Sequence, residues 1–260
     1  MKVKVRVWGG VSFINALIGM YGSAMAVKLP LILEVEESDR WLGDQIAKAI
    51  FEEIGLKGKF SVKVSSEIPQ GVGLKSSSAY TASLAIAGLA FKGNVDVDEA
   101  VKVSAKVSKR LGLSFTGAYD DAYASVLGGI VLTDNSTGKL ISRFEAPSAW
   151  KVTIAINEEL KKTVNQGLLE KFKELTDLLI RYVKERNFWA AALLNSLIVS
   201  SSNGYPKDPF IKAASTGAIA GISGNGPAYF AIKEGEPYVF EGMKNIFSSP
   251  ANEGYLLEVH

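Results

Sequence analysis

Residues 69–79, Pro-Gln-Gly-Val-Gly-Leu-Lys-Ser-Ser-Ser-Ala, join an expected strand to an expected helix and decide how the chain folds. Before them, apolar and polar residues alternate over 59–66, which predicts a half-buried strand. After them, residues 76–92 are rich in Ala, Leu and Ser without an internal breaker, which predicts a mostly buried helix. A strand that enters a helix through a glycine turn is therefore the expected centre of the molecule.

This glycine-serine loop, residues 69–79, is suited to binding phosphate. Gly71 and Gly73 can adopt positive φ and turn peptide N–H groups toward one point, and the helix that follows adds the positive end of its dipole. Ser76 and Ser77 offer hydroxyls to phosphate oxygens or to a magnesium ion, and Lys75 offers a positive charge. A tight turn with serine caps would use the same residues, so the loop alone leaves both interpretations open.

The order of the expected elements predicts an α+β protein. Alternating valines predict a strand over 2–8, the glycine-rich residues 9–27 predict turns and further extended chain, and 29–36 predict a second strand. Strands and helices do not alternate regularly, which argues against a doubly wound sheet. A P-loop fold is rejected for the same reason, and because Leu74 stands where the Walker A motif has a glycine. Residues 147–150 mark the expected boundary between two lobes, 1–148 and 149–260.

Composition excludes several kinds of site. The 260 residues include no cysteine, and the single histidine is His260, so thiolate catalysis is excluded and histidine triads are disfavoured. Proton transfer near neutral pH then falls to Asp, Glu, Lys or Tyr. The 29 Lys and Arg nearly balance the 27 Asp and Glu, which argues against a nucleic-acid partner. No apolar run approaches the roughly 20 residues of a membrane span, and we expect a cytoplasmic protein.

Two further motifs follow the glycine-serine loop. Residues 116–122 read Thr-Gly-Ala-Tyr-Asp-Asp-Ala and precede Gly128-Gly129. An aspartate near a terminal phosphate can accept the proton of an attacking hydroxyl, whereas two adjacent carboxylates can hold magnesium or simply cap a helix. Residues 223–227 read Ser-Gly-Asn-Gly-Pro before an expected apolar strand. Alone, that segment predicts only a glycine turn.

The three motifs together resemble the GHMP kinases, the superfamily of galactose, homoserine, mevalonate and phosphomevalonate kinases. Their signature Pro-x-Gly-x-Gly-Leu-x-Ser-Ser matches the glycine-serine loop, and the extra serine and the Asp-Asp pair are similar to those of archaeal shikimate kinases. The resemblance implies a two-lobed α+β fold, with a mixed α/β N-terminal lobe and a ferredoxin-like C-terminal lobe. It also implies ATP, Mg²⁺ and phosphorylation of the 3-hydroxyl of shikimate.

The same resemblance implies roles for particular residues. Counting back from Gly128, Asp121 is in register with the catalytic aspartate of the family and Asp120 is one residue off, and both are candidate catalytic residues. Asn15, Thr116 and Gly117 would contact the acceptor substrate. Magnesium would be held by Ser76 and Ser77, and the nucleotide would be bound by Pro69, Gly71, Val72, Gly73, Leu74, Lys75, Ser76, Ser77, Ser78, Gly224 and Gly226.

One departure from the family concerns the base. Mevalonate kinases place a lysine of the N-terminal segment close to the catalytic aspartate, but residues 11–15 contain none, so another group must act on Asp121. An Arg or Lys in the pocket should also pair with the shikimate carboxylate. Lys28, Lys109 and Arg110 are the basic residues near the motifs, and each is favoured as a surface charge.

Alternatives remain at the level of the sequence. The acceptor could be another alcohol of the superfamily, such as homoserine or an isoprenoid-pathway intermediate. The chain could instead be a nucleotide-binding module without catalysis. A homodimer is compatible with either alternative.

Overall fold

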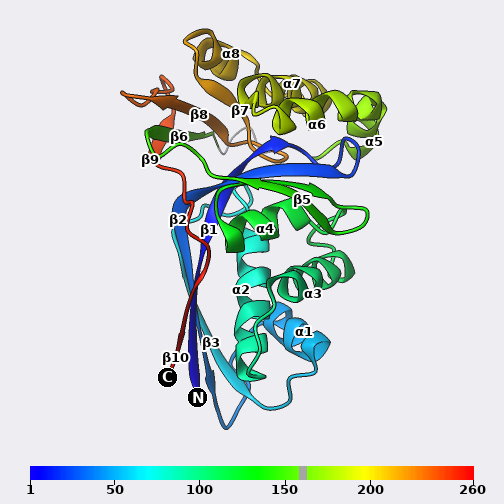
Figure 1. Ribbon diagram of the computed structural model, residues 1–260, viewed down its shortest axis with the longest axis vertical. Coiled ribbons are helices and arrows are strands. Elements are labelled where there is room, and N and C mark those ends of the chain that lie inside the picture. The colour runs from blue at the N-terminus through cyan, green and yellow to red at the C-terminus, as the bar shows by residue number, and fades with distance from the viewer. Residues whose placement is uncertain (158–162) are drawn as a thin grey trace.

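A computed structural model describes residues 1–157 and 163–260. The chain forms two antiparallel sheets with helices packed against them (Figure 1). The larger sheet has the strand order β10-β1-β2-β4-β5, and β3 also pairs with β2. Its strands are β1 (Lys2–Ile14), β2 (Tyr21–Glu37), β3 (Phe60–Ser66), β4 (Ile130–Asp134), β5 (Lys139–Phe144) and β10 (Leu256–Val259). The helices beside it are α1 (Gln45–Ile54), α2 (Ser76–Phe91), α3 (Val97–Arg110) and α4 (Tyr119–Leu127).

The smaller sheet has the order β7-β8-β6-β9 and lies at the other end of the molecule, with its own helices (Figure 1). Its strands are β6 (Trp150–Ile156), β7 (Ile219–Ile222), β8 (Tyr229–Glu234) and β9 (Lys244–Ser248). The helical segments are α5 (Gln166–Leu169), the 3-10 helix η2 (Glu170–Leu175), α6 (Thr176–Lys184), α7 (Phe188–Asn203) and α8 (Asp208–Ser215). The expected α+β class is confirmed.

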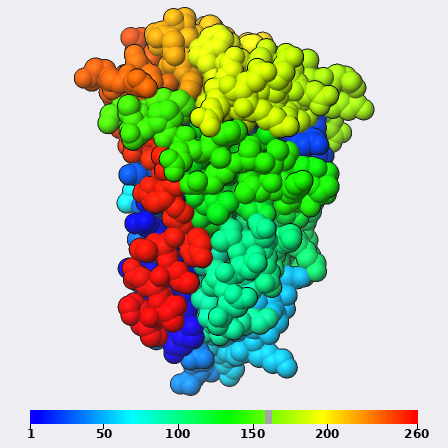
Figure 2. All heavy atoms as spheres, in the orientation of Figure 1, coloured from blue at the N-terminus to red at the C-terminus, as the bar shows by residue number. Residues whose placement is uncertain are grey.

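The last strand, β10, brings the C-terminal end of the chain beside the N-terminal end. β10 pairs with β1 in the larger sheet, and the C-terminal segment runs back along the side of the N-terminal part (Figure 2). Residues 256–259 thus lie far from the other strands that follow residue 149. The division of the chain into 1–148 and 149–260 stays a prediction.

α2 is the central helix of the larger layer. It packs against β1 and β2 and touches α1, α3 and α4, and its residues from Ser78 to Ala90 are nearly all buried. A helix that is covered on all sides has no polar face. This explains why small and apolar residues predominate in it, as the sequence predicts for 76–92.

The glycine-rich segment 9–27 contains both the extended chain and the turn that the sequence predicts. β1 continues to Ile14 through an irregular pairing at Trp8 and Gly9, the chain turns over residues 15–20, and β2 begins at Tyr21. A Cβ on Gly10 would lie 2.7 Å from the carbonyl oxygen of Met25, and one on Gly9 would lie 3.3 Å from that of Leu74. These two glycines therefore lie within the extended strand, where they allow close approach of neighbouring backbones.

Candidate active site

The three sequence motifs meet around one cavity of about 350 Å³. Segments far apart in the sequence contribute to its wall: the end of β1, the glycine-serine loop, the start of α4 and the turn between β7 and β8. Most of the expected site residues line it, namely Asn15, Gly71, Gly73, Leu74, Lys75, Ser76, Ser77, Ser78, Thr116, Asp120, Asp121, Gly224 and Gly226. Pro69, Val72 and Gly117 are not part of the lining.

The glycine-serine loop is held from behind by three consecutive carbonyl groups. The carbonyl of Val72 accepts a hydrogen bond from the N–H of Ala228 at 3.1 Å, and that of Leu74 accepts one from the N–H of Gly10 at 3.2 Å. The carbonyl of Gly73 accepts from the hydroxyl of Ser223 at 2.7 Å. Val72 therefore supports the loop from outside the cavity, and the loop is fixed before any ligand enters.

Gly73 is the point of closest approach between two motifs. Its φ is +89°, and a Cβ there would lie 2.1 Å from the carbonyl oxygen of Ser223. No side chain fits in that space, so the contact between the glycine-serine loop and residues 223–226 depends on glycine.

A Gly73→Ala variant is expected to lose at least about tenfold in affinity for ATP, because the two loops must separate to admit the methyl group. Calorimetric titration with a non-hydrolysable ATP analogue measures the effect. Gly93→Ala is the matched control, since Gly93 also has a positive φ of +82° but an added Cβ would meet nothing within 4 Å. Unchanged affinity in Gly73→Ala would contradict the prediction.

Both helices that begin at the cavity start without a side-chain cap. α2 follows Lys75 and α4 follows Ala118, and each of these two residues has a left-handed backbone, with φ of +73° and +51°. The first N–H groups of each helix therefore remain available to a ligand at the positive end of the helix dipole. The hydroxyls of Ser76 and Ser77 form no hydrogen bond to a described residue that would occupy them.

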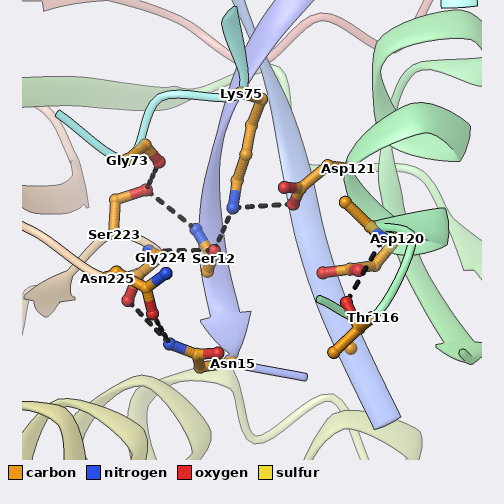
Figure 3. Close-up of polar contacts among 12 residues, drawn as sticks. Ser12, Asn15, Gly73, Lys75, Thr116, Asp120, Asp121, Ser223, Gly224 and Asn225 are labelled. Carbon is orange, nitrogen blue, oxygen red and sulfur yellow. Dashed lines mark hydrogen bonds and ion pairs between the residues drawn. The ribbon is translucent and has the colours of Figure 1, made fainter. Parts of the chain in front are cut away.

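Lys75 places a positive charge beside Asp121. Its ammonium group lies 2.7 Å from Oδ1 of Asp121 and also donates to the hydroxyl of Ser12 (Figure 3). The side chain of Lys75 is only 5% exposed, whereas that of Asp121 is 19% exposed and open to the cavity. The N-terminal segment has no lysine to place beside Asp121. Lys75, from the glycine-serine loop, occupies that position instead.

The side chain of Asp120 is more deeply buried than that of Asp121 and has different partners. It is 4% exposed, and its Oδ1 accepts a hydrogen bond from the side-chain amide of Asn135 at 2.9 Å. Burial, followed by the charge of Asp121, raises the pKa of Asp120 to about 7. Lys75 and Asn135 oppose this shift without cancelling it. Two adjacent carboxyl groups thus have different surroundings within one cavity.

Asn15, just after β1, joins the N-terminal segment to the motif at 223–227. Its side-chain amide donates to the carbonyl of Gly224 at 3.0 Å and to Oδ1 of Asn225 at 2.8 Å (Figure 3). Its own Oδ1 accepts from the N–H of Leu17 at 3.0 Å, and its backbone N–H donates to Asn195 at 2.7 Å. Asn15 lines the cavity as expected, but its side-chain hydrogen bonds are made within the protein.

Several polar residues of the site were not expected from the sequence. Ser12 accepts hydrogen bonds from Lys75 and, at 3.1 Å, from the N–H of Gly224. Asn135, Ser223 and Asn225 also make hydrogen bonds there, and Ser114 lines the cavity. Ser223 and Asn225 lie inside a quoted motif, which was a usable signal, but nothing in the local sequence distinguishes Ser12 or Asn135.

Basic residues are scarce around the cavity. Lys75 is the only Lys or Arg among the described residues that line it. Lys28 instead pairs with Glu253 at 3.7 Å, and Arg110 pairs with Glu53 at 2.9 Å. Lys109 lies over the ring of Tyr119, outside the cavity lining. The expected free partner for an acceptor carboxylate is thus not found in the described part of the wall.

The described residues contain no group of three or more acidic, histidine or cysteine side chains that could hold a metal ion. Magnesium at a phosphate site needs few protein ligands, because it retains waters and binds substrate phosphates. Within the described ranges, no helix is both long and apolar enough to cross a membrane.

Comparison with known proteins is consistent with this geometry. The model of the GHMP kinases N terminal domain matches residues 42–129. The chain is 38% identical to a shikimate kinase of Pyrococcus furiosus, over 69% of this chain and 67% of the relative. It is 33% identical to a shikimate kinase of Thermoplasma acidophilum, over 88% of this chain and 86% of the relative. Among solved structures, mevalonate-3-kinase from Thermoplasma acidophilum has a TM-score of 0.67 at 10% identity, covering 99% and 98% of the two chains.

Proposed function

Because the chain belongs to the GHMP kinase superfamily, alongside the archaeal shikimate kinases, we propose that it transfers the γ-phosphoryl group of ATP to the 3-hydroxyl of shikimate. The chain has the two-lobed fold of that superfamily and is a phosphotransferase with an alcohol acceptor. The observation that supports the proposal most directly is the position of Asp121, whose carboxylate shares one cavity with the glycine-serine loop.

In the proposed reaction the acceptor hydroxyl attacks the γ-phosphorus. A bond forms between the acceptor oxygen and phosphorus, the bond to the β-phosphate oxygen breaks, and ADP leaves. Asp121 takes the hydroxyl proton on its carboxylate. Lys75 holds that carboxylate in place through the 2.7 Å ion pair and adds positive charge next to the transferred group.

The nucleotide is assigned to the glycine-serine loop and the N-terminus of α2. Gly71 and Gly73 have positive φ, and the free N–H groups of the helix start lie in the same wall, as polyphosphate binding requires. Gly224 and Gly226 complete that wall from the other lobe. Ser76 and Ser77 fit Mg²⁺, which supplies charge neutralisation to the phosphates, because their hydroxyls are at the helix start and are not occupied by described residues.

The proposal extends to the setting of the protein. The lack of cysteine suits the reducing cytoplasm, and we assign the protein to that compartment. The two lobes are assigned to 1–148 and 149–260, with β10 returning to the first sheet. A homodimer stays a prediction, which light scattering of the purified protein measures.

The test is ADP release from Mg-ATP with shikimate, homoserine or mevalonate supplied separately. We expect release that depends on shikimate and a product phosphorylated at the 3-hydroxyl, identified by NMR. An assay without acceptor is the control for ATP hydrolysis. ADP release with homoserine or mevalonate but not with shikimate would overturn the shikimate assignment, while the assignment as a kinase would stand. Absence of release with every acceptor, together with ATP binding, would favour a non-catalytic nucleotide-binding module.

A further inference from the structure

Asp120 is a second carboxyl group in the cavity wall for which the proposed reaction has no use. Its position is strictly determined by its surroundings. Asn135, which is fully buried, donates to its Oδ1, and Asn135 is held in turn by the hydroxyl of Thr133 at 2.6 Å. The backbone N–H of Asn135 also donates to the carbonyl of Met20 at 2.7 Å. The carboxyl group is therefore held rigidly in the wall of the cavity.

Space for this carboxyl group is provided by a glycine on β2. A Cβ on Gly22 would lie 2.2 Å from Cγ of Asp120 and 2.5 Å from each of its oxygens. The hydroxyl of Thr116 lies on the same side, 3.4 Å from the side-chain nitrogen of Asn135 (Figure 3). Asp120 and Thr116 both line the cavity. Two hydrogen-bonding groups thus converge beside Asp121 without contacting it.

The chemistry of Asp120 favours a hydroxyl ligand over a metal ion. Burial and the charge of Asp121 raise the pKa of Asp120, which disfavours the deprotonated carboxylate that a metal ligand must be. A hydroxyl group can hydrogen-bond to the carboxyl in either protonation state, since it both donates and accepts. Asp120 and Asp121 are consecutive in the first turn of α4, so one helix end addresses two neighbouring positions on a ligand.

We propose that Asp120 and Thr116 form a subsite for a second hydroxyl of the acceptor, adjacent to the hydroxyl that Asp121 deprotonates. This inference rests on the proposed function and narrows the acceptor class to polyols with neighbouring hydroxyl groups. Asp120 is then a specificity-determining residue rather than a second base.

The first test changes only the substrate. Wild-type enzyme is compared on shikimate and on 4-deoxyshikimate, which lacks the hydroxyl next to the reacting one. We expect kcat/KM to be about 100-fold lower for the deoxy compound, because a site built to bind a hydroxyl is left unpaired without it. Equal values for the two compounds would overturn the subsite while leaving shikimate phosphorylation, and hence the proposed function, intact.

The second test changes the protein. In Asp120→Asn, which retains the volume and the acceptor for Asn135, the preference for shikimate over the deoxy compound is expected to fall to about tenfold or less. The KM for the acceptor should rise, and the KM for ATP should not change. A general loss of structure would instead alter both KM values. Asp134→Asn is the matched control, because Asp134 caps a turn through Ser136 and is not in the cavity lining.

A variant of Thr116 keeps the inference testable if the Asp120→Asn protein does not fold. Thr116→Val replaces the hydroxyl, which also accepts from the N–H of Ala118 and from Asn135, with a methyl group. It should lower the preference for shikimate over the deoxy compound by a smaller factor than Asp120→Asn does. Wild-type discrimination in both variants would overturn the inference. A raised Mg²⁺ requirement in Asp120→Asn, with the acceptor KM unchanged, would also overturn it and assign Asp120 to the metal.

Discussion

An Asp121→Asn variant is expected to turn over about 100- to 10,000-fold more slowly than wild type, since an amide cannot take the proton of the acceptor hydroxyl. Binding of ATP should persist, because the glycine-serine loop and the start of α2 are unaltered. Initial rates of ADP formation at saturating shikimate give kcat, and titration with a non-hydrolysable ATP analogue gives the affinity.

Asp134→Asn serves as the control for this variant, because it makes the same change of charge in a turn outside the cavity lining. We expect its kcat to equal that of wild type. If Asp121→Asn also turned over at the wild-type rate, Asp121 would not be the base. Residual turnover in Asp121→Asn that disappeared only with Asp120 would assign the base to the neighbouring carboxyl.

Lys75→Met is expected to have the second-largest effect. The ammonium group of Lys75 contacts Asp121 at 2.7 Å and also contacts Ser12, so its loss removes the charge that holds the base. We expect kcat to fall by about 100-fold. The variant should also lose about 3 kcal/mol in free energy of unfolding, because it leaves a largely buried carboxylate without its partner.

The double variant Lys75→Met, Asp121→Asn separates the two effects. Removing both charges should restore most of the unfolding free energy, as measured by urea denaturation, but none of the activity. A double variant as unstable as Lys75→Met would show that lost packing, rather than an unpaired charge, causes the instability. A wild-type kcat in Lys75→Met would exclude Lys75 from the reaction.

Much of the fold was predictable where local chemistry decides it. The helix over 76–92 follows from its side-chain composition, since small and apolar residues without a breaker suit a buried helix. For the segment 9–27 the sequence predicts turns and extended chain, and the structure has both. The backbones that Gly9 and Gly10 approach could not be predicted, because strand pairing and tertiary packing decide those contacts.

For the candidate site, too, local sequence indicates some residues and tertiary contacts decide others. The sequence indicated the glycine-serine loop and the aspartate pair because positive φ and an acidic helix start are local properties. Ser12 and Asn135 escaped notice, since their partners are set by strand pairing and not by sequence spacing. The pairing of Lys75 with Asp121 could not be predicted either, because the two residues are 46 positions apart and meet only in the folded chain.

The amino-acid sequence by itself determined the class of fold, the glycine turn of residues 69–79 and the family resemblance, because each depends on residue type and order along the chain. Tertiary structure alone decided which cation stands beside Asp121 and how two adjacent carboxyls differ. The physical reason is that an ion pair depends on distance in space and a pKa on burial, and both arise only when β1, α2 and α4 pack together around one cavity.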